Sequence, residues 1–256
     1  YGDVGDTDVQ VYDPATGRVW AVADRACDEA EPDWTPDGRS IVYQADCDGS
    51  YDIYLADVET RSTRRLTATG SQDEREPDVS PDGRWVVYRV NRDQDARNVD
   101  GELWVLDLGG GDPQPLGVSG RSPSWSPDGT QLLFMSERAG GWDVYVYSPA
   151  ERSTLRLTNC AANCRFPAWS PDGRSVVYHS TTGPATAEAE TIWRMAAAGG
   201  DPVLLVTGDG AGRPTWSADG WIVFNSQRGI EMVDEQGRQR RTLLADNSHW
   251  APAWSR

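Results

Sequence analysis

The chain has 256 residues, of which 40 are acidic and 24 are basic, so its formal net charge at pH 7 is −16. Such a protein lacks the basic surface that phosphate contacts require, and no nucleic-acid binding is expected. No apolar run approaches the ~18 residues of a membrane-spanning helix, so we expect no membrane insertion in this segment. An unbroken repeat leaves no linker, and residues 1–256 are predicted to form one domain.

The repeat is a short motif, Pro-x-Trp-Ser-Pro-Asp-Gly, which returns with small variations along the chain. The aspartates of its five full copies are 45, 46, 44 and 47 residues apart. A period near 45 residues with short strands is typical of β-propeller blades. The copies begin at Pro32, Pro77, Pro123, Pro167 and Pro214, with a truncated copy at Pro252.

Alternating apolar residues predict the strands in chain order. Residues 8–12 and 18–22 are expected to form the third and fourth strands of a closing blade. The first full repeat adds strands at 32–35, 41–43, 53–55 and 65–67, with Asp-Gly as the signal of the first hairpin. Later copies place strands at 86–88, 103–105, 132–134, 144–146, 176–178 and 192–193, and a last innermost strand at 251–255.

The unit PxWSPDGxxIxF, followed by an aromatic strand and a final Leu-Thr, resembles the repeat of TolB-like β-propellers. The resemblance covers nearly the whole chain. It implies an all-β fold of six four-stranded antiparallel blades, with a closing blade built from both termini. By repeat spacing, Tyr1 falls at the end of a second strand, so we expect this chain to be a domain of a longer protein. Tryptophans at one repeat position are expected to pack between blades: Trp34, Trp125, Trp169, Trp216 and Trp254.

The four cysteines fall in loops that a propeller places on one face. Cys27 lies in a blade-joining loop and Cys47 in the loop between the second and third strands of the next blade. Cys160 and Cys164 share one blade-joining loop. Two disulfides, Cys27–Cys47 and Cys160–Cys164, would imply a periplasmic or extracellular protein. The alternatives are four free thiols in a cytosolic propeller and, less well supported, a zinc site.

Acidic residues concentrate in the first 60 residues, which hold 15 of them against three arginines. A solvated acidic face that maintains solubility is one explanation. The other is a calcium site in the loop 46–52, where Asp46, Asp48 and Asp52 surround a glycine turn and could supply several oxygens. Asp28, Glu29 and Glu31 could add ligands on the same face. Calcium is therefore a possible cofactor, and a basic partner a possible ligand.

An acidic residue stands near the start of several third strands, at Asp8, Asp52, Glu102 and Asp143. The family resemblance implies that such an acid faces an arginine at the end of the second strand, as Arg138 precedes Asp143. A structural role for these pairs competes with a set of carboxylates at a binding face. His249 and Trp250, in a blade-joining loop, are further candidate contact residues.

Function is predicted from the loops, since the chain has two histidines and no nucleophile elbow, and no catalytic residue is assigned. We expect a monomeric, non-enzymatic interaction or sensor module outside the cytoplasm. It would bind a protein or peptide through the face that carries the cysteines and the acidic cluster. One alternative is a carbohydrate- or peptide-processing propeller that uses a metal and carboxylates on this face. Another is a structural spacer in a larger receptor or kinase.

Overall fold

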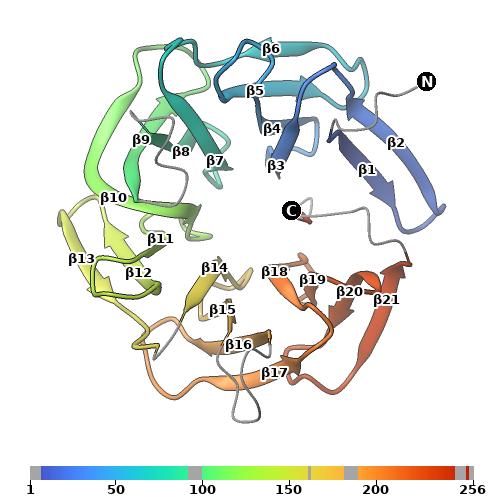
Figure 1. Ribbon diagram of the computed structural model, residues 1–256, viewed down its shortest axis with the longest axis vertical. Coiled ribbons are helices and arrows are strands. Elements are labelled where there is room, and N and C mark those ends of the chain that lie inside the picture. The colour runs from blue at the N-terminus through green and yellow to red at the C-terminus, as the bar shows by residue number, and fades with distance from the viewer. Residues whose placement is uncertain (1–6, 92–99, 161–162, 182–189, 246–251, 254–256) are drawn as a thin grey trace.

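Antiparallel sheets surround a central axis in the described part of the chain (Figure 1). A computed structural model describes residues 7–91, 100–160, 163–181, 190–245 and 252–253. Strands are the only regular elements in these ranges, and they contain no helix that could span a membrane. The predicted all-β, propeller-like fold is therefore confirmed.

Three four-stranded sheets repeat the same antiparallel order, in which the first strand of each lies nearest the central axis (Figure 1). We call them units 1, 4 and 5, after the repeat copies that form them. Unit 1 contains β3 (Glu29–Trp34), β4 (Ser40–Ala45), β5 (Asp52–Asp57) and β6 (Thr63–Arg65). Unit 4 contains β14 (Cys164–Trp169), β15 (Ser175–Ser180), β16 (Thr191–Ala196) and β17 (Val203–Thr207). Unit 5 contains β18 (Gly212–Trp216), β19 (Ile222–Ser226), β20 (Gly229–Val233) and β21 (Arg240–Leu244).

Units 2 and 3 are joined into a seven-stranded sheet because one long strand, β10 (Gln114–Trp125), belongs to both. Its first half pairs with β9 and completes unit 2, while its second half pairs with β11 and begins unit 3. The other strands of unit 2 are β7 (Asp73–Val79), β8 (Trp85–Asn91) and β9 (Gly101–Asp107). Those of unit 3 are β11 (Leu132–Ser136), β12 (Asp143–Ser148) and β13 (Ser153–Arg156).

The first two strands, β1 (Val9–Asp13) and β2 (Arg18–Ala23), pair with each other in a separate two-stranded sheet. They agree with the strands predicted at 8–12 and 18–22. The innermost strand predicted at 251–255, including Trp254, lies outside the described residues except for Pro252 and Ala253.

The repeated Ser-Pro-Asp-Gly sequence forms the turn after each inner strand. In unit 2, the Ser80 hydroxyl donates to Asp82 Oδ1 (2.5 Å) and accepts from the backbone N–H of Trp85 (2.8 Å). Gly83 has φ +71°, a conformation that glycine adopts without steric cost. The same hydroxyl-to-carboxylate bond recurs in the pairs Thr35–Asp37, Ser126–Asp128, Ser170–Asp172 and Ser217–Asp219.

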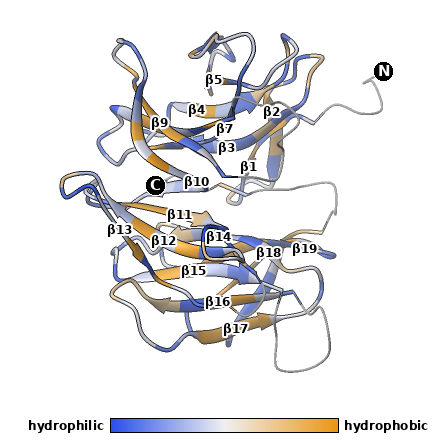
Figure 2. Ribbon diagram, turned by 60° about the vertical axis from the view of Figure 1, so that its left-hand side comes forward, coloured by the Kyte–Doolittle hydropathy of each residue, from blue (hydrophilic) through white to orange (hydrophobic). Residues whose placement is uncertain are grey.

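Apolar side chains fill the space between neighbouring units rather than a single centre. One cluster joins Val42 and Ile53 of unit 1 to Val79 and Tyr88 of unit 2, all nearly inaccessible to solvent. Figure 2 shows the hydrophobic residues concentrated along the strands. Among the repeat tryptophans, burial between units confirms the packing prediction for Trp125, Trp169 and Trp216, whereas Trp34 is partly buried.

Both predicted disulfides are present, and none of the four cysteines is free. The Cα atoms of Cys27 and Cys47 are 4.9 Å apart, and those of Cys160 and Cys164 are 6.0 Å apart. The free-thiol and zinc hypotheses are therefore wrong for this structure.

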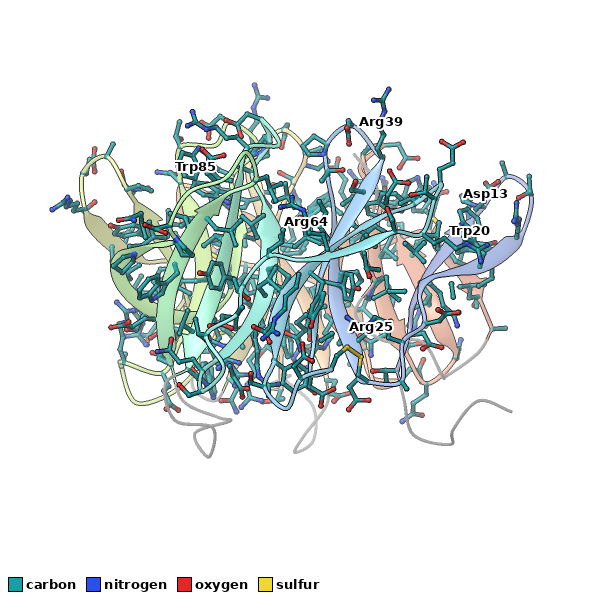
Figure 3. The ribbon with its side chains drawn as sticks, turned by 90° about the horizontal axis from the view of Figure 1, so that it is seen from above. Asp13, Trp20, Arg25, Arg39, Arg64 and Trp85 are labelled. Carbon is teal, nitrogen blue, oxygen red and sulfur yellow. A yellow bond between two sulfur atoms is a disulfide. The ribbon has the colours of Figure 1, made fainter. Side chains whose placement is uncertain are left out.

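A disulfide lies beside Arg25 at one end of the molecule, and the turn residue Arg39 lies at the opposite end (Figure 3). We call these ends the disulfide face and the turn face.

The two disulfides are predicted to stabilise the fold unequally. The Cys27–Cys47 bond joins residues separated by 20 positions, whereas the Cys160–Cys164 bond spans only four. Loop-closure entropy then gives about 3 kcal/mol of unfolding free energy for the first bond and about 2 kcal/mol for the second. Urea unfolding of Cys27→Ser/Cys47→Ser and Cys160→Ser/Cys164→Ser proteins measures both values. Equal losses would contradict the entropic explanation.

Candidate binding site

Each inner strand contains a β-bulge at the same repeat position. In unit 2 the pairing of β7 with β8 shifts register between Arg75 and Asp78. The residue before the repeat proline lies in this bulge and has a positive φ, although residues before proline normally are extended. The five residues are Glu31 (φ 51°), Glu76 (57°), Ser122 (46°), Phe166 (51°) and Arg213 (44°), which we call the bulge ring.

The bulge ring surrounds a cavity of about 150 Å³ between the inner strands of all five units. Bulges re-aim side chains, and here they place two carboxylates, a hydroxyl, an aromatic ring and a guanidinium around one space. The prolines that follow each ring residue, together with Pro252 and Ala253, complete the cavity wall. Figure 1 shows β3, β7, β10, β14 and β18 around this centre.

Glu76 is the most heavily bonded member of the bulge ring. Its backbone N–H donates to Gln44 Oε1 (2.9 Å), and its Oε2 accepts from the backbone N–H of Ser122 (2.7 Å). Arg121 Nη2 donates to Oε1 (3.1 Å), and Arg89 Nε lies 3.1 Å from Oε2. Burial opposes ionisation of Glu76, but the charges of Arg89 and Arg121 outweigh it and lower its pKa.

Arg213 connects two other ring members across the cavity. Its guanidinium forms an ion pair with Glu31 and lies over the Phe166 ring, 4.5 Å from the ring centroid. The bulge ring therefore contains a cation, two carboxylates, an aromatic ring and a hydroxyl. Such a set has the chemistry to contact both polar and apolar parts of a peptide.

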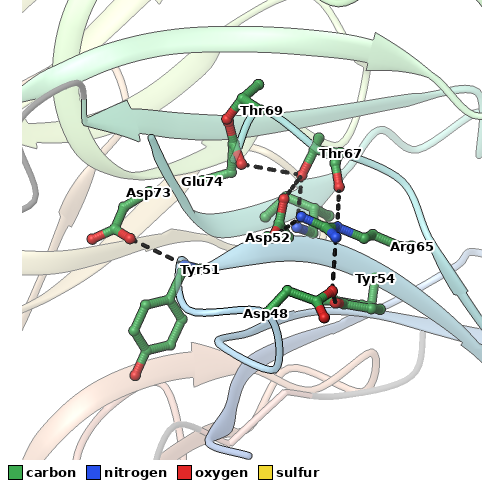
Figure 4. A network of polar contacts seen from close by, with 10 residues as sticks. Asp48, Tyr51, Asp52, Tyr54, Arg65, Thr67, Thr69, Asp73 and Glu74 are labelled. Atoms are coloured by element: carbon green, nitrogen blue, oxygen red, sulfur yellow. Dashed lines mark hydrogen bonds and ion pairs between the residues drawn. The ribbon is translucent and has the colours of Figure 1, made fainter. Parts of the chain in front are cut away.

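Arg65 contacts two of the predicted calcium-loop residues, Asp48 and Asp52 (Figure 4). Arg65 donates from Nη1 to Asp48 Oδ2 (2.7 Å) and from Nη2 to Asp52 Oδ2 (2.6 Å). Asp52 is fully buried and also accepts from the Thr67 hydroxyl (3.4 Å). Asp46 Oδ1 accepts from the backbone N–H of Asp28 (2.9 Å). A cation between Asp48 and Asp52 would have to displace the Arg65 guanidinium.

The prediction that Arg138 pairs with Asp143 is wrong. Arg156, at the end of the fourth strand, donates to Asp143 Oδ2 (2.6 Å). Arg138 instead donates to the Ser136 hydroxyl (2.8 Å) and to the carbonyl of Ser119. Asp52 with Arg65 repeats the Asp143–Arg156 geometry, because β5–β6 and β12–β13 have the same register. A third acid–arginine pair, Glu231–Arg240, lies in unit 5 and had no sequence signal in the expected place.

The other candidate residues are dispersed. Glu29 is 1% exposed beside the Cys27–Cys47 bond, and Asp28 accepts from the backbone N–H of Thr7 (3.3 Å). Asp8 and Glu102 are exposed, and Glu102 accepts from Trp104 Nε1 (3.2 Å). His249 and Trp250 lie outside the described residues. Of the predicted binding residues, only Glu31 belongs to the bulge ring.

Comparison with known proteins identifies the family. The model of the TolB beta propeller domain matches residues 95–256, more than half of the chain. The chain belongs to the TolB β-propeller family.

Solved structures agree with this assignment. TolB from Acinetobacter baumannii is similar at 21% identity with a TM-score of 0.77, covering 91% of this chain and 58% of that one. A putative TolB from Agrobacterium tumefaciens is similar at 20% identity with a TM-score of 0.78, covering 93% and 88% of the two chains. At these identities the likeness shows the fold alone. The uncharacterized protein Atu1656 of Agrobacterium fabrum is 28% identical over 114 residues, which make up 41% of this chain and 38% of that protein. This TolB β-propeller therefore spans less than two thirds of the length of both the A. baumannii protein and Atu1656.

Sequence reasoning missed four of the five ring residues in this TolB β-propeller. The available signal was the position itself: the residue before the repeat proline is Glu in the first two copies and then Ser, Phe and Arg, while the proline does not change. Ser122, Phe166 and Arg213 have nothing in common chemically, so a search for acidic clusters passes over them.

Glu29 predicts a pH-dependent stability. Burial raises its pKa from 4.5 to about 7, and its Oε2 has no hydrogen-bond partner among the described residues. Because the folded state binds this proton more tightly than the unfolded chain, the contribution is favourable below pH 4.5 and is lost as pH rises through 7. Glu29→Gln should therefore be more stable than the parent at pH 8, by an amount on the order of 2–3 kcal/mol.

Urea unfolding of both proteins at pH 5 and pH 8 measures this difference. The advantage of Glu29→Gln should shrink at pH 5. Glu59→Gln, which alters an exposed glutamate, is the matched control and should leave the pH dependence unchanged. A Glu29→Gln protein that is less stable than the parent at pH 8 would show that the ionised carboxylate is stabilising.

Proposed function

We propose that this chain is a non-enzymatic interaction module that binds a protein or peptide at the bulge ring and the surrounding disulfide face. The observation that carries the proposal is the ring itself. Five backbone positions of uncommon conformation direct side chains of four chemical kinds to one cavity. Unusual backbone conformations that a fold maintains cluster at functional sites.

The repeat offers an internal comparison that supports binding. Prolines and turn aspartates recur because the fold needs them, whereas the ring position holds Glu, Glu, Ser, Phe and Arg in successive copies. A side chain that faces a cavity and is not needed for packing can vary between repeats. Such a side chain can determine binding specificity without disturbing the fold. Binding residues typically occupy such places on a rigid scaffold.

We further propose a six-bladed ring in which β1 and β2 share a closing blade with the C-terminal segment. The position of Pro252 and Ala253 in the cavity wall supports this arrangement. Closure would remove the exposed strand edges that otherwise promote aggregation.

The two disulfides support a periplasmic or extracellular location. We expect a monomer, whose mass in solution can be measured by light scattering.

The alternative is an enzyme, since structures of similar fold include an oligogalacturonate lyase in complex with manganese, with 13% identity and a TM-score of 0.67. Two observations favour binding. Asp52 and Asp143, the best carboxylate candidates, are buried and paired with arginines. Burial and the neighbouring Arg165 lower the pKa of His179 to about 4, which makes it a weak base at neutral pH. An enzyme would lose turnover in Asp48→Asn or Asp52→Asn.

Binding at the ring is tested by filling the cavity. Thr215 lines it without lying in the left-handed region, so Thr215→Trp should fold and obstruct the cavity. A partner crosslinked to the parent protein in the extracytoplasmic fraction should bind at least about tenfold more weakly to Thr215→Trp, because a lost buried contact costs about 1.4 kcal/mol or more. Leu155→Ser, an exposed position on β13, is the control and should leave affinity unchanged. Equal affinity for the parent and Thr215→Trp would exclude the ring.

Calcium binding by Asp46, Asp48 and Asp52 stays a separate proposal. A ligand that binds only the folded state raises its stability by mass action. Thermal unfolding in excess calcium and in EDTA tests it. A rise in Tm that Asp48→Asn abolishes would support the site, whereas identical curves would leave Asp48 and Asp52 to Arg65 and Asp46 to the backbone of Asp28.

A further inference from the structure

Four arginines gather at the disulfide-face ends of units 2 to 4, in a protein whose net charge is −16. Arg75, Arg121 and Arg165 each stand immediately before a member of the bulge ring, and Arg89 faces Arg75 across the β7–β8 ladder. Burial is the main cause that lowers the pKa of Arg89, and the charges of Arg121 and Arg75 lower it further. Burial likewise lowers the pKa of Arg165, and the charge of Arg121 adds to this effect. We call this group the arginine arc.

Several nitrogens of the arginine arc are buried without an acceptor. Arg89 is 2% exposed, and its Nη1 has no hydrogen-bond partner within the described structure. The Nε atoms of Arg121 and Arg165 are likewise buried and unpartnered there. A buried charged donor without an acceptor is expensive, and native proteins normally satisfy such groups. These nitrogens therefore indicate a missing anionic acceptor.

His179 provides a second, independent indication at the same place. It pairs with Arg165 across the β14–β15 ladder, and its ring centroid is 6.2 Å from that of Phe166 in the bulge ring. The side chain is 6% exposed, yet neither Nδ1 nor Nε2 has a partner in the described ranges. A neutral imidazole carries one N–H, so His179 can donate one hydrogen bond to a ligand beside Arg165.

Aromatic rings hold the guanidinium groups in fixed orientations. The guanidinium carbon of Arg75 lies 3.6 Å from the centroid of Tyr51. Arg121 and Arg165 both lie near Trp142, at 5.6 Å and 5.4 Å from its ring. Stacking of this kind is favourable for arginine and leaves its planar edge available for a carboxylate.

Acidic residues neutralise only part of the arginine arc. Asp73 pairs with Arg75, and Glu76 is shared between Arg89 and Arg121. Arg165 forms no ion pair among the described residues. The charge of Glu137 only partly opposes the burial and the Arg121 charge that lower the pKa of Arg165. Among the described residues, two acids pair with the four arginines of the arc, which leaves a net positive site beside the cavity.

We propose that the arginine arc and His179 bind a carboxylate side chain of an acidic peptide segment that enters the central cavity. This proposal rests on the proposed function in taking a polypeptide as the ligand, and it assigns the chemistry of one end of that ligand. Arg165 and His179 would bind the carboxylate, and the proline and Phe166 walls would contact its aliphatic part.

The surroundings favour a carboxylate over a phosphate. A carboxylate matches the planar edge of one guanidinium, and its single charge suits Arg165, the member of the arc without an ion pair among the described residues. A dianionic phosphate would bring its second charge near Glu76 and Glu31. The acidic residues of unit 1 still suit a basic segment, so one partner can present both charges to different parts of this face.

Peptide titration tests the proposal with the whole 256-residue protein. The probe is N-acetyl-triglutamate amide, with the triglutamine peptide as its neutral match and inorganic phosphate as a second anion. The chain has two histidines, so His249→Gln leaves one imidazole signal to report on His179 by NMR. Triglutamate should shift that signal and bind at least about tenfold more tightly than triglutamine, since a hydrogen bond to a charged group contributes about 1.5–3 kcal/mol.

Matched charge variants locate the site. Arg165→Gln should weaken triglutamate binding at least about tenfold by the same reasoning. Arg84→Gln removes the same charge from an exposed arginine of the turn in unit 2 and should leave affinity within about twofold, because a distant exposed charge is screened.

Equal binding of the two peptides, no movement of the His179 signal, or an unaltered affinity in Arg165→Gln would each overturn the proposal. Phosphate that binds more tightly than triglutamate would overturn the assignment to a carboxylate. Since the probe is synthetic, these outcomes do not depend on capture of a natural partner. A failed partner capture with successful triglutamate binding would reject the proposed function alone.

Discussion

The bulges in the inner strands free backbone N–H groups, and side chains of the preceding unit accept them. Glu76 N–H donates to Gln44, Ser122 N–H to Glu76, and Phe166 N–H to the sulfur of Met135. Leaving a buried N–H unpaired costs about 1–3 kcal/mol, so units 2, 3 and 4 each depend on the unit that precedes them. Hydrogen bonds from Val79 N–H to Asp33 and from Trp125 N–H to Asp78 extend the same dependence along the strands. The ring geometry and the cavity both follow from this constraint.

Local chemistry made much of the fold predictable. Ser80, Asp82 and Gly83 lie within four residues of one another, so their turn could be predicted from the sequence alone. Loop placement likewise brought Cys27 close to Cys47, which required only the order of strands in a blade. The bulge ring was not predictable in this way, because a residue before proline is expected to be extended. Its positive φ goes with the pairing of the inner strand to the second strand and with the hydrogen bonds from ring N–H groups to the preceding unit.

The partner of each buried acid also depended on information that sequence patterns do not contain. Arg156 lies opposite Tyr145 in the β12–β13 ladder. Asp143 is two residues before Tyr145 on β12 and therefore faces the same side of the sheet, within reach of Arg156. Arg138 is closer to Asp143 in sequence but bonds within its own loop. Register therefore decided the ion pair, and register between the third and fourth strands has no signature in the residues themselves. The calcium hypothesis overlooked Arg65 for the same reason. The register of β5 with β6 brings the Arg65 guanidinium to both Asp48 and Asp52.

Charge is distributed in a way that total composition conceals. Unit 1 contains Glu29, a buried carboxylate whose Oε2 has no hydrogen-bond partner among the described residues, whereas units 2 to 4 contain arginines with buried, unpartnered nitrogens. Both arrangements reduce stability, because each leaves ionisable groups poorly solvated and incompletely paired. A domain whose only task was to hold its neighbours apart would gain stability from replacing Arg165 and His179 with apolar residues of similar volume. Their presence beside a cavity, with four kinds of residue at the ring position of the five repeats, is better explained by a ligand that supplies the missing acceptors.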